Sequence, residues 1–179
     1  MKPFNDMDYI DHYRSPLGGI TLASDGTAIT GLWFDGQKHF AYNLSDKTVE
    51  NPTKPVFEQT RHWLDLYFSG RCPDFTSPLK PQGTPFQQRV WNTLLSIPYG
   101  HTTTYGEIAT HIAQTFHETS VQPARMSAQA VGQAVGRNPI AIIIPCHRVI
   151  GANGSLTGYA GGLDKKAWLL KLETNTDWK

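Results

Sequence analysis

The sequence is best understood from the stretch Ile140-Ala141-Ile142-Ile143-Ile144-Pro145-Cys146-His147-Arg148-Val149. Its apolar residues from 140 to 143 predict a buried strand. Proline cannot continue the hydrogen-bond ladder of a central strand, so Pro145 predicts a turn at the strand's end. The turn would place Cys146 and His147 together in a bent loop, where cationic neighbours favour the reactive thiolate. We therefore expect a nucleophilic cysteine at this point of the chain.

Three helices are expected between Thr84 and Gly136, directly before this stretch. Thr84-Pro85-Phe86-Gln87 forms a capping box with proline at the first helical position, and Thr104-Tyr105-Gly106-Glu107 forms a second capping box. A polar loop is expected from Gln114 to Met126. Ser127 would then cap a third, short helix over Ala128 to Gly136. Two helices, a connection and a third helix of small residues favour a helix-turn-helix.

The third helix has an unusual edge, because Gly132 and Gly136 lie one turn apart and leave it without side chains. Each glycine destabilises a helix by roughly 1 kcal/mol relative to alanine, so the bare edge needs a reason. Close approach of another backbone is a sufficient reason. That backbone is either a neighbouring helix of the protein or a nucleic-acid strand, and the sequence leaves both alternatives open.

The first half of the sequence is expected to form strands followed by one helix. Tyr9 to Ser15, Ile20 to Ala23 and Thr27 to Phe34 are strand candidates, and Asp25-Gly26 is a hairpin signal between the last two. The next segment is predicted to be helical because its apolar residues share one stripe, namely Val56, Phe57, Trp63, Leu64, Tyr67 and Phe68. Gly70 follows at a position where helices commonly end.

A proline-rich connection from Cys72 to Gly83 divides the chain, and we place a domain boundary there. We expect a small strand-rich N-terminal domain over residues 1–80 and a helical C-terminal domain over 84–175. The fold class is therefore α/β in the α+β arrangement.

The residues after the cysteine motif predict three further features. Asn153-Gly154 is a hairpin signal. Gly158-Tyr159-Ala160-Gly161-Gly162 is expected to be a loop that brings backbone close to a ligand. A final helix is predicted from Leu163 to Glu173.

Composition excludes several classes of protein. The 179 residues are 39% hydrophobic and 17% charged, as in ordinary globular proteins, and contain no apolar run long enough to span a membrane. Residues 1–11 lack the apolar core of a signal peptide. Cys72 and Cys146 are too few for a disulfide framework, so a cytoplasmic location is expected, with one disulfide as the less favoured alternative. The seven histidines show no metal-ligand spacing, and we expect no metal.

Charge is distributed unevenly along the chain although the net charge is only +1. Up to Gly83 there are 8 Lys/Arg and 10 Asp/Glu, and from Thr84 onward there are 8 and 5. The positive second half weakly favours an anionic partner, although chance variation on a solvated surface explains the counts equally well.

The cysteine motif resembles the active-site region of the O6-alkylguanine-DNA alkyltransferases. The resemblance rests on Asn138-Pro139, the following apolar stretch, Pro145-Cys146-His147-Arg148-Val149-Ile150-Gly151, the loop 158–162, and Trp168-Leu169-Leu170 followed by Glu173. It covers about Thr84 to Glu173, and in the first half it extends only to the strand-rich layout and to Tyr67-Phe68-Ser69-Gly70.

This resemblance implies a ribonuclease H-like N-terminal domain and a C-terminal domain with a winged helix-turn-helix. It implies a stand-alone protein of the bacterial type that uses no cofactor and, as a monomer, binds the minor groove of double-stranded DNA that contains alkylated bases. The alkyl group of O6-alkylguanine, and also of O4-alkylthymine, would move to the protein in one irreversible, stoichiometric step. A thiolate is the strongest nucleophile that proteins have for displacement at an alkyl carbon.

The same resemblance assigns roles to the residues of the site. Cys146 would be the alkyl acceptor, with His147 as base through a water molecule and Glu173 orienting the imidazole. Asn138 would tie the third helix to the active-site loop. Tyr105 would donate to the leaving guanine and help to turn the damaged nucleotide out of the stack. The substrate pocket would be formed by Val135, Val149, Tyr159 and Ala160.

The third helix would bind DNA through Gln129, Ala130, Gly132 and Arg137. Most members of the family insert an arginine into the minor groove at the position of Gln129. Glutamine is shorter and uncharged, so we expect it to fill the gap left by the extruded base less well. The stretch from Gln114 to Met126 is a second departure, because it is longer than is usual in the family.

Two other classes of function compete with DNA repair by alkyl transfer. One is a sensor that binds damaged DNA without reacting, but relatives of that type lack the cysteine, which is present here as Cys146. The other is a Cys-His hydrolase on an unrelated fold. A hydrolase would need an oxyanion hole and a peptide or ester cleft, for which the sequence contains no separate signal.

Overall fold

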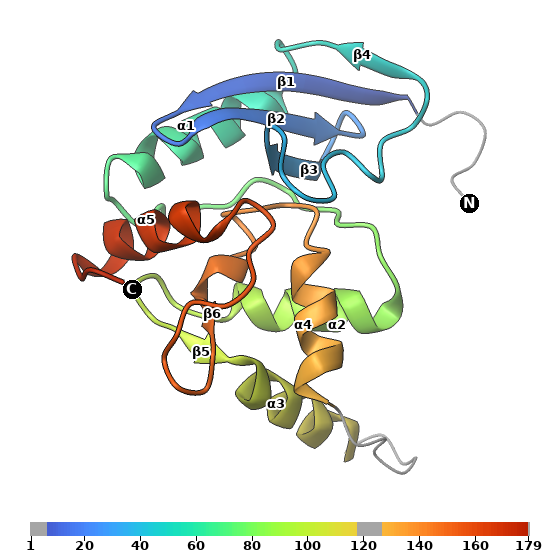
Figure 1. Ribbon diagram of the computed structural model, residues 1–179. Coiled ribbons are helices and arrows are strands. Elements are labelled where there is room, and N and C mark those ends of the chain that lie inside the picture. Colours follow the sequence, from blue (N-terminus) through green and yellow to red (C-terminus); the bar gives the residue numbers. More distant parts are fainter. Residues whose placement is uncertain (1–6, 118–126, 179) are drawn as a thin grey trace. The chain divides into compact units, whose positions relative to one another are not determined.

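The computed structural model describes residues 7–117 and 127–178. By their contacts these residues form two compact units. The first comprises Met1–Gln82 together with Pro139–Ile143, and the second comprises Gly83–Asn138 together with Ile144–Lys179. The elements of each unit are labelled in Figure 1.

A four-stranded sheet with the order β3-β2-β1-β4 forms the first unit. β1 (Asp8–Ser15), β2 (Gly18–Ser24) and β3 (Ile29–Phe34) are antiparallel neighbours, as expected for consecutive hairpins. The predicted turn at Asp25-Gly26 joins β2 to β3, and Gly26 has a φ of 100°, which favours glycine. β4 (Thr48–Glu50) pairs in parallel with β1 and was not expected, because three exposed residues carry no alternating pattern.

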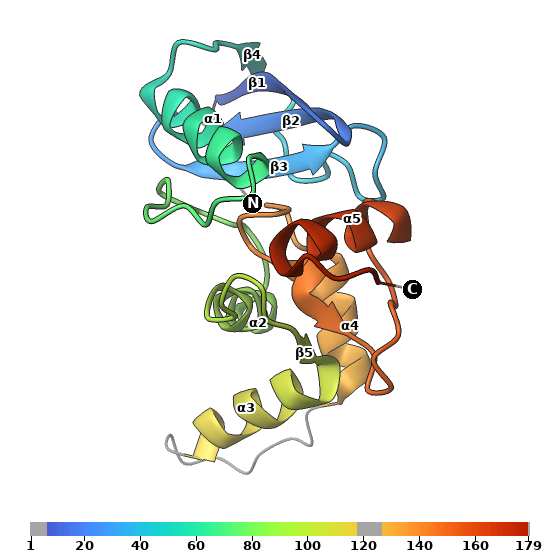
Figure 2. The same cartoon turned by 90° about the vertical axis from the view of Figure 1, so that its left-hand side faces the viewer.

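The predicted helix of the first unit is α1 (Pro55–Phe68), which lies along one face of the sheet (Figure 2). Its inward stripe is buried and consists of Val56, Phe57, Thr60, Trp63, Leu64 and Tyr67. The amide of Gly70 donates to the carbonyl of Tyr67, and that of Arg71 donates to Leu66, in a Schellman motif. Gly70 therefore ends the helix as its position in the sequence predicted, with a φ of 81°.

The open edge of β3 is covered in two places by irregular chain. Ile29 exchanges backbone hydrogen bonds with Pro78 and Lys80, and Leu32 exchanges them with Pro139 and Ala141. Covering an edge in this way removes a site for unwanted strand pairing.

The strand expected over residues 140–143 is not formed, although these residues are buried as predicted. Only Ile140 makes a bridge, and the next residues turn, with Ile142 at a φ of 68°. A positive φ is incompatible with an extended strand, so apolar composition correctly indicated burial but not conformation.

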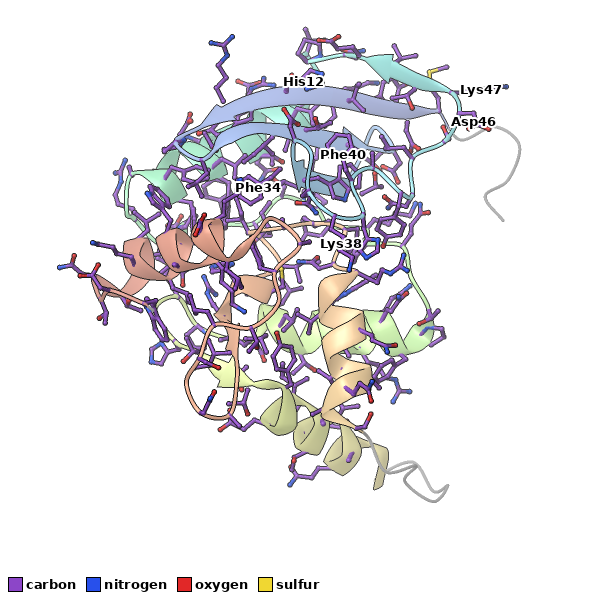
Figure 3. All side chains as sticks on the ribbon, viewed as in Figure 1. His12, Phe34, Lys38, Phe40, Asp46 and Lys47 are labelled. Atoms are coloured by element: carbon purple, nitrogen blue, oxygen red, sulfur yellow. The ribbon has the colours of Figure 1, made fainter. Side chains whose placement is uncertain are left out.

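The segment between β3 and β4 carries exposed aromatic side chains. Figure 3 shows Lys38 and Phe40 on this segment. The ring centroid of Phe40 lies 6.0 Å from that of Trp33, which is fully buried in β3. The partly exposed ring thus packs on the core of the first unit.

The second unit contains α2 (Pro85–Leu95), α3 (Tyr105–His117), α4 (Ala128–Gly136) and α5 (Leu163–Thr174). α2, α3 and α4 pack on one another, and the indole Nε1 of Trp91 in α2 donates to the carbonyl of Ala134 in α4 at 2.9 Å. Two short strands, β5 (Thr103–Thr104) and β6 (Val149–Ile150), pair in parallel. The mixed α/β fold and the three helices expected for a helix-turn-helix are confirmed.

Two local predictions in this unit were wrong. α3 continues to His117, so the beginning of the expected polar loop at Gln114 is helical. The rest of that loop, residues 118–126, lies outside the described residues. The Asn153-Gly154 turn is present, and the Gly151 amide donates to the Ser155 carbonyl. The expected hairpin is not formed, because no strand follows this turn in the described residues and β6 pairs with β5 instead.

Within the two described ranges, no helix is both long and apolar enough to cross a membrane.

We expect Thr84→Ala to lower the free energy of unfolding by about 1 kcal/mol. The Thr84 hydroxyl accepts from the Gln87 amide, and this bond is lost in the variant, whereas the bond from the Thr84 backbone amide to the Gln87 side chain can remain. Urea unfolding measures the change. Thr93→Ala in the same helix is the control, because that hydroxyl bonds only to the Arg89 carbonyl and its loss should leave stability unchanged. Equal effects of the two substitutions would contradict the expectation.

Candidate active site

The thiol of Cys146 lies at the first residue of η1 (Cys146–Arg148), a short 3-10 helix that precedes β6. Pro145 stands at the N-cap of this helix with a ψ of 63°, so the chain bends directly before the cysteine. The predicted turn at Pro145 is therefore present, but it follows another turn rather than a strand. Cys146 is buried, with 6% of its surface exposed, and Cys72 is exposed. The two cysteines are unpaired, so the alternative of a disulfide was wrong.

The side chain of Asn138 connects the end of α4 to the cysteine. Its Nδ2 donates to the carbonyl of Ile144 at 2.8 Å and to Sγ of Cys146 at 3.1 Å. Asn138 is 5% exposed, so these bonds form in a place with little water. The amide both fixes the backbone of the bend and stabilises negative charge on the sulfur.

The carboxylate of Glu173 in α5 accepts hydrogen bonds from three partners. His147 Nε2 lies 2.6 Å from Oε1, and Gly100 N donates to Oε2 at 3.1 Å. Arg148 uses two nitrogens, with Nε 2.8 Å from Oε2 and Nη2 3.0 Å from Oε1. His147 is fully buried and Glu173 is 9% exposed. A buried charge requires such partners, because an unpaired one would be strongly destabilising.

The environment of Cys146 does not favour the thiolate at rest. Burial raises the pKa of the thiol, and the Asn138 hydrogen bond and the positive charge of Lys166 oppose this only in part. A cationic neighbour favours the thiolate as expected, but it is Lys166, because the Arg148 side chain is directed to Glu173, and burial outweighs its effect. The thiol therefore needs a base before it can react.

His147 has the properties of such a base. Burial lowers the pKa of His147 below the ordinary imidazole value, against the opposing effect of Glu173, so the ring is neutral at pH 7. Burial alone would raise the pKa of Glu173, but the hydrogen bonds from His147 and Arg148 and the charge of Arg148 outweigh it and hold the pKa well below its usual range. An ionised carboxylate thus faces one ring nitrogen, and Nδ1 is the nitrogen that can take a proton.

Tyr105 and Tyr159 complete the polar part of the site. The Tyr105 hydroxyl, at the start of α3, donates to the carbonyl of Thr157 at 3.0 Å, and burial raises the pKa of this phenol. The Tyr159 hydroxyl is shielded from solvent and has no hydrogen-bond partner among the residues that the structure describes. Burial raises the pKa of Tyr159 well above its ordinary value, and the charges of Cys146 and Glu173 raise it further. Both phenols therefore remain protonated.

Comparison with known proteins gives this geometry its context. The model of the 6-O-methylguanine DNA methyltransferase DNA binding domain matches residues 85–175, and that of the ribonuclease-like domain of the same enzyme matches residues 9–81. The chain belongs to the 6-O-methylguanine DNA methyltransferase family. The ribonuclease-like match agrees with the expected class of the N-terminal domain.

Two named relatives are similar over most of their length. The methylated-DNA–protein-cysteine methyltransferase of Methanosarcina acetivorans is 47% identical over 166 residues, which are 92% of this chain and 97% of the relative. The protein of the same name from Mycobacterium tuberculosis strain H37Rv is 47% identical over 165 residues, 90% and 92% of the two chains.

Solved structures in the methyltransferase family have the same fold. The structure of Mycobacterium tuberculosis OGT in complex with DNA superimposes with a TM-score of 0.79 and 43% identity, covering 94% of this chain and 93% of that one. The Methanococcus jannaschii O6-methylguanine DNA methyltransferase gives a TM-score of 0.64 and 28% identity, with 95% of each chain covered.

Hydrogen bonds join two pairs of the residues predicted for this methyltransferase site, and the charge of Cys146 acts on Tyr105 and Tyr159. Hydrogen bonds connect Asn138 to Cys146, and His147 to Glu173. Val135 is buried on α4 and Val149 is buried in β6, whereas Ala160 is partly exposed.

Of the residues predicted to bind DNA, Gln129, Ala130 and Gly132 lie in α4, and Arg137 is its C-cap. Gln129 and Arg137 are exposed, and Ala130 and Gly132 are partly exposed. A methyl group added at Gly132 would lie 3.6 Å from the Tyr105 ring, an ordinary contact, and one added at Gly136 would meet no described atom within 4 Å. Tight helix packing within the described chain therefore does not explain the bare edge.

Sequence reasoning missed Lys166. This side chain is fully buried in α5, and its Nζ donates to the carbonyls of Val149 at 2.5 Å, Thr157 at 2.8 Å and Gly158 at 3.2 Å. Burial lowers its pKa to about 8. Lys166 precedes Glu173 by seven residues, which places both on one helix face, and this spacing was the available signal.

No group of three or more His, Cys, Asp or Glu side chains in the described ranges could hold a metal ion.

We expect Asn138→Ala to slow alkylation of Cys146 by iodoacetamide at pH 8, because the thiolate loses a donor and the pKa of the thiol rises further. It should also lower the free energy of unfolding by about 1–3 kcal/mol, since the Ile144 carbonyl loses its side-chain donor. The measurement uses a Cys72→Ser background, so that only Cys146 reacts.

Asn92→Ala, at an exposed position of α2, is the matched control and should change neither quantity. An unchanged alkylation rate in Asn138→Ala would show that the amide does not stabilise the thiolate.

Proposed function

We propose that this protein repairs alkylated DNA by transferring the alkyl group of O6-alkylguanine, and also of O4-alkylthymine, to Sγ of its own Cys146. The observation that carries the proposal is the set of buried hydrogen bonds that places Asn138 on the thiol and Glu173 on the adjacent His147. The chain belongs to a family whose relatives are named for methylated DNA and a protein cysteine. One similar structure was solved in complex with DNA.

The first step is removal of the thiol proton. A neutral His147 takes the proton of Cys146 at Nδ1 by way of a water molecule, while Nε2 keeps its bond to Glu173. Glu173 orients the ring and stabilises the imidazolium that forms. The Asn138 amide and the charge of Lys166 stabilise the thiolate in a buried place, where each interaction is stronger than in water.

The second step is displacement at the alkyl carbon. The thiolate forms a carbon–sulfur bond while the carbon–O6 bond breaks and its electron pair leaves with the guanine. Tyr105 protonates the leaving base, and the proton held on His147 later restores the phenol through solvent. The product is a thioether, which has no easy leaving group. Each molecule of protein therefore reacts once.

The substrate base must leave the duplex stack to reach a buried thiol. The unpartnered hydroxyl of Tyr159 supports its role as one wall of the pocket, together with Val135, Val149 and Ala160. Val149 and Ala160 would contribute backbone groups to the base edge.

DNA would be bound in its minor groove by α4, through Gln129, Ala130, Gly132 and Arg137. The bare edge at Gly132 and Gly136 supports this role, since a nucleic-acid backbone can approach where no side chain intervenes. Minor-groove proteins commonly use small residues and polar amides in this way.

We further propose that the protein acts as a cytoplasmic monomer with an N-terminal support domain over residues 1–80 and the reactive domain over 84–175. Unpaired cysteines suit a reducing compartment. The reactive residues and α4 come from the second unit alone, which supports action by one chain.

Intact-protein mass spectrometry with duplex DNA that carries one O6-methylguanine tests the reaction. We expect the mass to rise by one methylene per chain, with the modification on Cys146. Cys146→Ser should show no gain, and Cys72→Ser, which alters an exposed cysteine, should react like the unchanged protein. Binding without a mass gain would make the protein a damage sensor. The absence of both binding and transfer would refute the proposed function.

We expect Gln129→Arg to tighten binding to alkylated duplex DNA by about fivefold, roughly 1 kcal/mol, since an added cation at the groove releases counterions. Fluorescence anisotropy at several salt concentrations measures the affinity and its salt dependence. Asn92→Arg adds the same charge at an exposed position of α2 and is the control. An equal gain for both variants would indicate a general charge effect, and no gain for Gln129→Arg would remove that position from the DNA contact.

A further inference from the structure

We propose that Arg148 is a positioning residue of the proton relay, which keeps Glu173 ionised and in place so that the proton from Cys146 stops on His147. This inference rests on the proposed function. It adds to that function a residue that touches neither the substrate nor the reacting sulfur.

The contacts of Arg148 use every part of its guanidinium. Nε and Nη2 bind the two oxygens of Glu173 at 2.8 and 3.0 Å, and Nη1 donates to the carbonyl of Ile97 at 2.6 Å. The guanidinium carbon also lies 5.7 Å from the centre of the Tyr99 ring. Arg148 therefore fastens the Glu173 carboxylate to the segment that follows α2, and only a planar fork makes all three bonds together.

The position of Glu173 depends on this fastening. Its Oε1 receives both His147 Nε2 and Arg148 Nη2, and its Oε2 receives Arg148 Nε and the Gly100 amide. Without Arg148, the carboxylate would lose one hydrogen bond at each of its two oxygens. Rotation about its last side-chain bond would then change the direction in which the imidazole is held.

The charge of Arg148 decides where the proton rests. A cation on the carboxylate lowers the proton affinity of Glu173, and it also opposes a positive charge on His147. Both effects keep the ring neutral before the reaction and the carboxylate ionised during it. The other charged groups that act on the pair come from η1 and α5, namely Arg148 on both members and Lys166 on His147. The hydroxyl of Tyr159 and the thiol of Cys146 also face this part of the site, and the charge of Glu173 raises the pKa of Tyr159.

Removing the Arg148 cation should shift the pH dependence of methyl transfer in one direction, toward higher pH. The His147–Glu173 pair would hold an extra proton more tightly, so the neutral base would appear only at higher pH. Transfer at pH 7 would then slow, but the rate would recover as the pH rises. A merely structural role would lower the rate by the same factor at every pH and would leave the midpoint unchanged.

The test is the single-turnover rate of methyl transfer from O6-methylguanine duplex DNA to Cys146, measured from pH 5 to 9. We expect Arg148→Met to move the acid midpoint upward by about one pH unit, with a roughly tenfold loss at pH values below the midpoint of the unchanged protein that disappears at high pH. Arg148→Lys keeps the charge and loses the fork, so its shift should be smaller. Arg89→Met, on the exposed face of α2, should behave like the unchanged protein.

The titration of His147, followed by NMR of labelled imidazole in the full chain, separates the two proposals. If the unchanged protein does not transfer methyl groups, the proposed function fails, and the NMR midpoint still tests the role of Arg148. If Arg148→Met does not fold, Arg148→Gln, which also lacks the charge, carries the test by both measurements. An unchanged midpoint in a folded variant without the charge would overturn the inference.

Discussion

The structure of the site depends on one buried negative charge, the carboxylate of Glu173. The carboxylate and its partners come from three separate parts of the second unit, since Gly100 follows α2, His147 and Arg148 lie in η1, and Glu173 itself lies in α5. Leaving such a charge unpaired destabilises a protein by about 3–5 kcal/mol. The requirement to pair it therefore holds these three segments in one arrangement, and that arrangement also aims the imidazole.

This arrangement explains how a reactive cysteine can remain unreactive until substrate arrives. Burial and the neighbouring groups give a thiol of raised pKa beside a histidine of lowered pKa, so the resting pair is neutral. A neutral pair is cheaper to bury than an ion pair, and it exposes little thiolate to chance oxidation or alkylation. The nucleophile is generated where it is used, which suits a protein that can react only once.

Local signals in the sequence were accurate wherever neighbouring residues decide the conformation. The capping box at Thr84, the turn at Asp25-Gly26 and the helix end at Gly70 are all present, because each depends on bonds within four or five residues. The strand predicted over residues 140–143 is not formed. These residues are buried by segments that are distant in the sequence, and Ile142 has a positive φ. The prediction also missed Lys166, since lysine is seldom buried and its three carbonyl partners lie 8 to 17 residues away.

The sequence by itself determined the three antiparallel strands β1 to β3, the helices α1 to α5 and the family resemblance of the cysteine motif. Those features depend on residue types and on short spacings along the chain. Only the tertiary structure decided the state of these residues, because the pKa of a group depends on burial and on charges from other elements. Arg148 illustrates the difference: in sequence it lies two residues from the thiol, but in the folded chain its charge belongs to Glu173, a residue 25 positions away.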